Sequence, residues 1–146
     1  MQAKLINSSP EQTYALVFST GDEVLKQLTQ FAAEKQLLGA HFTAIGAFQR
    51  VTLGYFEIDK QEYKQIPVDE QVEVLSFIGN IVEYQGKPKI HAHVVVGRSD
   101  GSTRGGHLVN AIVRPTLEVI LTESPEHLRR KMDKEAGIPL INLQQE

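Results

Sequence analysis

Short connections between strand-like segments constrain the fold of this chain most. From about residue 40 to residue 122, runs of apolar, aromatic and β-branched residues are separated by only a few polar or glycine residues. These runs are Ala40–Phe48, Val51–Ile58, Tyr63–Val68, Val72–Tyr84, His107–Arg114 and Leu117–Thr122, and an earlier one covers Thr13–Ser19. Most of these connections are too short for the crossovers that parallel strands need. The sequence therefore predicts a largely antiparallel sheet.

Two segments predict helices that pack on this sheet. Thr20 and Glu23 have the spacing of a capping box, and apolar residues then recur every three or four positions until Gly39. The apolar residues of this first helix are Val24, Leu25, Leu28, Phe31 and Ala32. A second start signal, Ser124-Pro125-Glu126, predicts a helix through about Lys134. The predicted class is α+β, a mainly antiparallel sheet with packed helices in a single compact domain.

Length and composition set the remaining bounds. A chain of 146 residues is expected to form one domain. The first residues, 1–12, are polar and contain Pro10, which predicts a loose lead-in before a domain at 13–146. Cysteine is absent, which excludes disulfides and thiolate metal ligands. The N-terminus has no apolar signal core and no apolar run is long enough to span a membrane, so we expect a cytoplasmic protein.

Charge gives little reason to expect a nucleic-acid or membrane partner. The formal net charge is −3, which provides no general attraction to DNA or to anionic lipids. The densest cationic cluster, Arg129-Arg130-Lys131, is flanked by acidic residues on the predicted second helix. Such a cluster is typical of a solvated helix face.

The segment Lys89–Asn110 contains three of the five histidines. His91 and His93 alternate with apolar residues, so on a strand they point to one face about 6–7 Å apart. The Ser-, Gly- and Asp-rich segment Arg98–Gly106 predicts a reversal that brings His107 back beside them. Three imidazoles without a thiolate would leave one coordination position open, as in catalytic zinc sites. The sequence thus indicates a divalent metal site, with zinc as the first candidate.

The same residues also allow a purely structural interpretation. A histidine on a strand is often a half-buried polar residue that is hydrogen-bonded to its neighbours. Gly105 and Gly106 can serve simply to provide positive φ for the turn. The spacing leaves both interpretations open.

Charged residues near the histidines are candidates for ligand contact. Arg98 and Arg104 flank them and can hold a carboxylate in a bidentate manner, or they can be exposed loop charges. An enzyme would also need an acid–base group. Glu57, Glu73 and Glu118 lie in strand-like runs, but the sequence does not tell which of them faces the histidines. The catalytic residues therefore stay unknown.

Several separate motifs, in this order, carry a family resemblance. They include AIGAFQRVTLGYFE, EVLSFIGNI, KIHAHVVVGRSDG and GGHL, within a span from Tyr14 to Leu143. In this order they resemble the plants-and-prokaryotes conserved (PPC) domain family. The resemblance implies an α+β fold and a homotrimer. Bacterial members often carry a DNA-binding label because plant members join this domain to AT-hooks, but this chain has no Arg-Gly-Arg core of such a hook.

The fold of this family is similar to that of acetolactate decarboxylase, which holds zinc with an H-x-H pair and a later histidine. Carried over by position, the ligands would be His91, His93 and His107. Two functions are consistent with these expectations. The first is a metal-binding trimeric module whose partner is a small molecule, or DNA by the family label alone. The alternative is a zinc-dependent enzyme with a decarboxylase-like or hydrolytic reaction.

Overall fold

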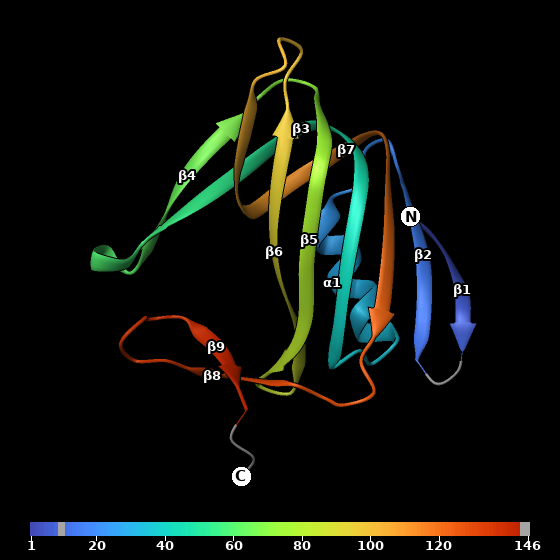
Figure 1. The fold of residues 1–146 in the computed structure, drawn as a ribbon, viewed down its shortest axis with the longest axis vertical. Coiled ribbons are helices and arrows are strands. Elements are labelled where there is room, and N and C mark those ends of the chain that lie inside the picture. Colours follow the sequence, from blue (N-terminus) through green and yellow to red (C-terminus); the bar gives the residue numbers. More distant parts are fainter. Residues whose placement is uncertain (9–10, 144–146) are drawn as a thin grey trace.

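A computed structural model describes residues 1–8 and 11–143 (Figure 1). In chain order the elements are β1 (Gln2–Ser8), β2 (Gln12–Ser19), α1 (Val24–Glu34), β3 (Gly39–Glu57), the 3-10 turn η1 (Ile58–Lys60), β4 (Glu62–Val68), β5 (Val72–Tyr84), β6 (Lys87–Gly97), β7 (Thr103–Glu123), β8 (Arg129–Met132) and β9 (Pro139–Asn142). All nine of these strands belong to one sheet. Among them only β5 and β8 pair in parallel, so the sheet is mixed and largely antiparallel.

Four strands close the sheet into a ring. β3 pairs with β5, β5 with β6, β6 with β7, and β7 returns to pair with β3. The closure is possible because β3 and β7 are long and change their registers along their length. At Gly46 the backbone has φ +148°, and a Cβ added there would lie 2.3 Å from the carbonyl oxygen of Thr116. Only glycine therefore fits where β3 crosses β7.

The two faces of the sheet have different surroundings. Inward-facing residues form one hydrophobic core, in which Phe77 makes edge-on contacts with Phe42 and Phe48. Helix α1 lies behind the sheet in Figure 1 and buries its apolar face. The buried residues of this face are Val24, Leu28, Phe31 and Ala32, four of the five that the sequence predicts. The opposite, outer face of β6 presents its alternate residues to solvent.

The predicted fold class of α+β with packed helices is wrong. Within the described residues α1 is the only α-helix, and strands make up most of the chain. The segment from Ser124, predicted as a second helix, is irregular, bends at Pro125 and Glu126, and leads into the β8–β9 hairpin. The strand prediction broken at Pro115 is also changed, because β7 runs through this proline as one strand.

Contacts with distant residues explain the missing second helix. The amide of Ser124 donates to the carbonyl of Gly39, and the amide of Leu128 donates to that of Leu38. A Cβ on Gly39 would lie 2.6 Å from the carbonyl oxygen of Glu126, so this glycine permits the close approach. The backbone donors that a helix would use are thus bound to another part of the chain, which overrides the local start signal.

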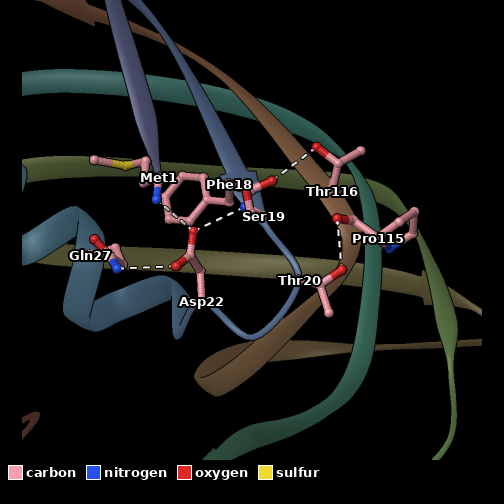
Figure 2. Close-up of polar contacts among 8 residues, drawn as sticks. All are labelled: Met1, Phe18, Ser19, Thr20, Asp22, Gln27, Pro115 and Thr116. Carbon is pink, nitrogen blue, oxygen red and sulfur yellow. Dashed lines mark hydrogen bonds and ion pairs between the residues drawn. The ribbon is translucent and has the colours of Figure 1, made fainter.

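The N-cap of helix α1 lies three residues after Thr20, the N-cap that the sequence predicts. Its N-cap is Glu23, whose carboxylate accepts hydrogen bonds from the amides of Leu25 and Lys26. Asp22 does not cap the helix but joins three elements (Figure 2). Its carboxylate pairs with the Met1 amine at 2.7 Å and accepts hydrogen bonds from the Ser19 amide and the Gln27 side chain.

The N-terminal residues of the described chain take part in the sheet. Gln2–Ser8, within the segment treated above as a lead-in, pair antiparallel with β2 as strand β1. No helix in the described residues is both long enough and apolar enough to cross a membrane.

Candidate metal centre

His91 and His93 lie on the outer face of β6. They alternate with the buried residues Ala92 and Val94, as expected for a strand with one face on the core. His91 is half-buried and His93 is exposed. Their ring centroids are 5.0 Å apart. The predicted common orientation of the pair is therefore confirmed.

The reversal between β6 and β7 brings His107 to the same place. A tight turn at Arg98–Ser102 contains Gly101 with φ +81°, and the two strands then run antiparallel with His93 opposite His107. The His107 ring centroid lies 5.3 Å from that of His91 and 5.7 Å from that of His93.

The two glycines before His107 are not the source of positive φ in the turn. Gly106 instead allows a close approach of strands, because a Cβ added there would lie 2.7 Å from the carbonyl oxygen of Gly54. Gly106 thus lets β7 approach β3 closely just before His107.

Tyr63 of β4 covers the third histidine. The rings of Tyr63 and His107 have centroids 4.6 Å apart and are inclined by 32°. Gly54 of β3 leaves room for this contact, since a Cβ there would lie 2.9 Å from Cδ1 of Tyr63. No local pattern in the sequence points to Tyr63, because its position depends on the pairing of β4 with β3.

The environment keeps His91 and His107 neutral. Burial, followed by repulsion from His91 and His93, lowers the pKa of His107 to about 4. The pKa of His91 is also lowered, first by burial and then by the nearby His93, Arg130 and Lys89. At neutral pH both rings therefore have the uncharged form that metal ligation requires.

The three histidines fit one divalent metal ion. One nitrogen from each ring can be chosen so that all three lie within 4.8 Å of one another. A tetrahedral zinc ion with bonds of about 2.0–2.1 Å holds its nitrogens roughly 3.3 Å apart, so the described separations are of the order that one ion needs. In addition, Nδ1 of His107 is buried and has no hydrogen-bond partner in the described structure. A buried imidazole nitrogen without a partner is costly, and a metal ligand would satisfy it.

The predicted cationic contacts, Arg98 and Arg104, lie in the β6–β7 turn and at the start of β7. Arg98 pairs with Glu70 at 2.5 Å and lies near Asp100 in the β6–β7 turn. Arg104 is exposed and stands one position out of phase with Gly105 and His107 along β7, so its side chain leaves from the other face of the strand.

The acidic candidates do not join the histidines either. Glu57 pairs with Lys60 at the end of β3. Glu73 is opposite Gly97, and Glu118 is opposite Val17 and Ile45 in other parts of the sheet. Among the described residues, the candidate metal-binding group consists of the histidines alone.

Arg130, which the sequence predicts to lie on a solvated helix face, lies beside the histidines in the structure. Arg130 of β8 donates a hydrogen bond from Nη2 to Oδ1 of Asn80 at 2.7 Å. Asn80 is the cross-strand partner of His91, so the guanidinium lies beside the histidines. No local signal could reveal this contact, because the two residues are 50 positions apart.

Comparison with known proteins places the chain in a family. Residues 6–125 match the Plants and Prokaryotes Conserved (PCC) domain, the family abbreviated PPC above. This chain belongs to the PCC domain family. A structural neighbour from Bacteroides thetaiotaomicron carries a provisional DNA-binding label; it is 26% identical, with a TM-score of 0.88 over 98% of this chain and 99% of that one.

Two further comparisons bear on the metal and on the length of the relatives. A metal-containing protein from Archaeoglobus fulgidus is 31% identical to this PCC chain, with a TM-score of 0.82 over 97% of this chain and 96% of that one. The bifunctional protein GlmU of a Synechococcus strain is 26% identical over 129 residues, which are 86% of this chain but only 20% of that protein.

The expected likeness to acetolactate decarboxylase concerns the fold. A Staphylococcus aureus protein of unknown function, described as similar to alpha-acetolactate decarboxylase, is 12% identical to this PCC chain. Its TM-score is 0.55 over 84% of this chain and 53% of that one.

Proposed function

We propose that this PCC protein is a metal-binding module in which His91, His93 and His107 hold one divalent ion, with zinc as the first candidate. The convergence of three imidazole nitrogens within 4.8 Å carries the proposal. The neutral state of His91 and His107 and the unpartnered Nδ1 of His107 support it. The metal content of the Archaeoglobus fulgidus relative points in the same direction.

The proposed site binds a small molecule through the ion. Three histidines supply three neutral ligands and leave a coordination position for a water or a ligand. When bound, the ion would supply Lewis-acid polarisation of a ligand oxygen. Tyr63 would shield the His107 side of the site, and Arg130 would border the His91 side.

We further propose that the chain assembles as a homotrimer. Exposed apolar residues on the outer face support self-association. Ile120, Thr43, Ile78 and His93 are opposite one another across β7, β3, β5 and β6, and both isoleucines are about half exposed. Contiguous exposed apolar side chains of this kind are typical of protein interfaces.

A zinc-dependent enzyme is the second candidate, favoured by the open coordination position. A decarboxylase-like or hydrolytic reaction would need a group that moves a proton next to the ligand. Glu57, Glu73 and Glu118 have their described contacts elsewhere. We therefore prefer the binding role. Only the label of a structural neighbour suggests DNA as a partner, and the net charge of −3 provides no general attraction to DNA.

Substitution of one ligand tests the metal site. His93→Ala should weaken zinc binding by more than about a hundredfold, since even changes outside the ligands themselves cost roughly 10–100-fold. Zinc affinity is measured by calorimetry on metal-stripped protein, and bound metal by elemental analysis. His41→Ala is the matched control, because His41 is exposed on the outer face of β3 and lies outside the cluster.

The control variant and the oligomeric state are two further readouts of this test. His41→Ala should bind zinc like the wild type, and the oligomer should survive in both variants. Equal zinc affinity and equal metal content in wild type and His93→Ala would refute the ligand assignment.

A further inference from the structure

We propose that the three-histidine site takes a small oxyanion, carried as a carboxylate or a phosphate, and that Arg130 is the residue that recognises it. The inference rests on the metal site proposed above and assigns a ligand class to it. It starts from the position of Arg130, which two hydrogen bonds fix. Nη2 donates to Oδ1 of Asn80 at 2.7 Å, and Nη1 donates to the carbonyl oxygen of Pro139 at 3.1 Å.

These bonds place the guanidinium next to the first histidine. Asn80 and His91 are opposite each other on β5 and β6, so their side chains leave the same face of the sheet side by side. Arg130 reaches this face from β8, which pairs with the end of β5. Its charge contributes to lowering the pKa of His91, after burial and His93.

Arg130 has unused donor capacity. Its Nε is buried and finds no hydrogen-bond acceptor in the described structure. The described ion pairs give Arg98 the partner Glu70 and Arg129 the partner Glu83, but they give Arg130 no carboxylate. Burial lowers the pKa of Arg130, yet a guanidinium stays charged at neutral pH. A partly buried cation without a counter-ion is costly, and a bound anion would offset that cost.

The charge around the histidines favours the same class of ligand. Lys89 precedes His91 by two residues on β6, so it shares the outer face, and its Nζ lies 5.0 Å from the Tyr84 ring centroid. Lys89 contributes to lowering the pKa of both His91 and His107. A divalent ion held by three neutral rings would add two positive charges to those of Lys89 and Arg130. Since no carboxylate joins the described cluster, the field there attracts an anion.

Two hairpins hold the groups that flank the site. Tyr63 arrives on β4 and Arg130 on β8, and the hairpins meet where Nε2 of Gln61 donates to the carbonyl oxygen of Glu135. Gly137, in the β8–β9 turn, lies against the same glutamine. The position of Arg130 is therefore braced from two sides, as recognition of a planar or tetrahedral oxyanion requires.

The experiment uses zinc-loaded protein and two probes, acetate and inorganic phosphate, titrated separately by calorimetry. Arg130→Gln should weaken binding of the preferred probe roughly ten- to a hundredfold, the usual cost of losing a hydrogen bond to a charged group. Lys89→Gln, at an exposed position, should weaken it roughly two- to fivefold. Arg129→Gln is the matched control, because it removes the same charge from the neighbouring residue. The exposed side chain of Arg129 forms an ion pair with Glu83 instead.

Each outcome decides the inference. The probe that binds more tightly identifies the carboxylate or the phosphate as the preferred source. Absence of binding for both probes, or equal losses in Arg130→Gln and Arg129→Gln, would overturn the inference. Zinc affinity is measured on every variant first. If the proposed metal site is wrong, zinc does not bind at the histidines. If only the inference is wrong, zinc binds and Arg130→Gln leaves the anion affinity unchanged. If Arg130→Gln does not fold, Lys89→Gln and Arg130→Lys provide the comparison.

Discussion

At the residue scale, single glycines decide how closely the strands approach each other. Gly79 lies in the middle of β5. A Cβ at this position would lie 2.4 Å from the Phe42 ring and 2.7 Å from the carbonyl oxygen of His91. The core ring of Phe42, opposite Gly79 on β3, causes this close approach.

Gly79→Ala should therefore lower the free energy of unfolding by roughly 1–3 kcal/mol, the usual cost of overpacking a core. The midpoint of urea unfolding measures this change. Gly97→Ala serves as the control, because its added Cβ would meet only the side chain of the exposed Leu75. Two variants of equal stability would contradict the close packing at Gly79.

At the element scale, Asp22 connects the start of β1, the end of β2 and helix α1 (Figure 2). Burial raises the pKa of Asp22, but the hydrogen bonds from the Met1 amine, the Ser19 amide and the Gln27 side chain outweigh it. The pKa of Asp22 is thus held below its ordinary value. The stabilisation is complete above the pKa of the unfolded chain and is lost as the pH falls through the folded pKa.

Asp22→Asn should cost about 1–2 kcal/mol of unfolding free energy at pH 7, because the remaining bonds lose their charge assistance. The difference from wild type should shrink as the pH falls below about 4. Chemical unfolding at several pH values measures it, and Asp59→Asn, exposed on η1, is the control. A difference that is constant down to pH 2 would show that the carboxylate charge has no part in the stability.

Local patterns predicted those elements whose burial follows their own periodicity. The alternation around His91 and the three- and four-residue spacing of α1 each identify a buried face, so both were predicted. The β8–β9 hairpin was missed because the amides of Ser124 and Leu128 bind the carbonyls of Gly39 and Leu38. Arg130 was missed for the same reason, because its contact with Asn80 joins residues that are 50 positions apart. The three histidines could be predicted as a group because a single short turn joins their strands.

At the scale of the whole molecule, the outer face of the sheet is the surface on which the proposed self-association depends. Ile120 is 47% exposed and lies on β7, in the same cross-strand row as Thr43, Ile78 and His93. Ile120→Lys should convert the proposed trimer into monomers, because a charge in an apolar contact is costly to desolvate. Light scattering after size exclusion should give three times the 16.3 kDa chain mass for the wild type and one times this mass for the variant.

Ile58→Lys is the control for this change, since Ile58 is 70% exposed on η1, apart from the outer face of the ring. Its mass should equal that of the wild type. A wild type with the mass of one chain, or a trimeric Ile120→Lys, would contradict the proposed assembly.

The shared strand β7 also determines when the protein can fold. β2, β3 and β6 all need β7 as a neighbour, and its pairs with β2 join residues about a hundred positions apart, such as Thr13 and Thr122. Contacts so distant in sequence form slowly, because a long loop must close before they contribute any stability. On the ribosome the β2–β7 pairs can form only after residue 122 has emerged. Docking of β2 on β7 is consequently a late step, whereas the β6–β7 hairpin that carries the three histidines joins near neighbours in the sequence and can form before it.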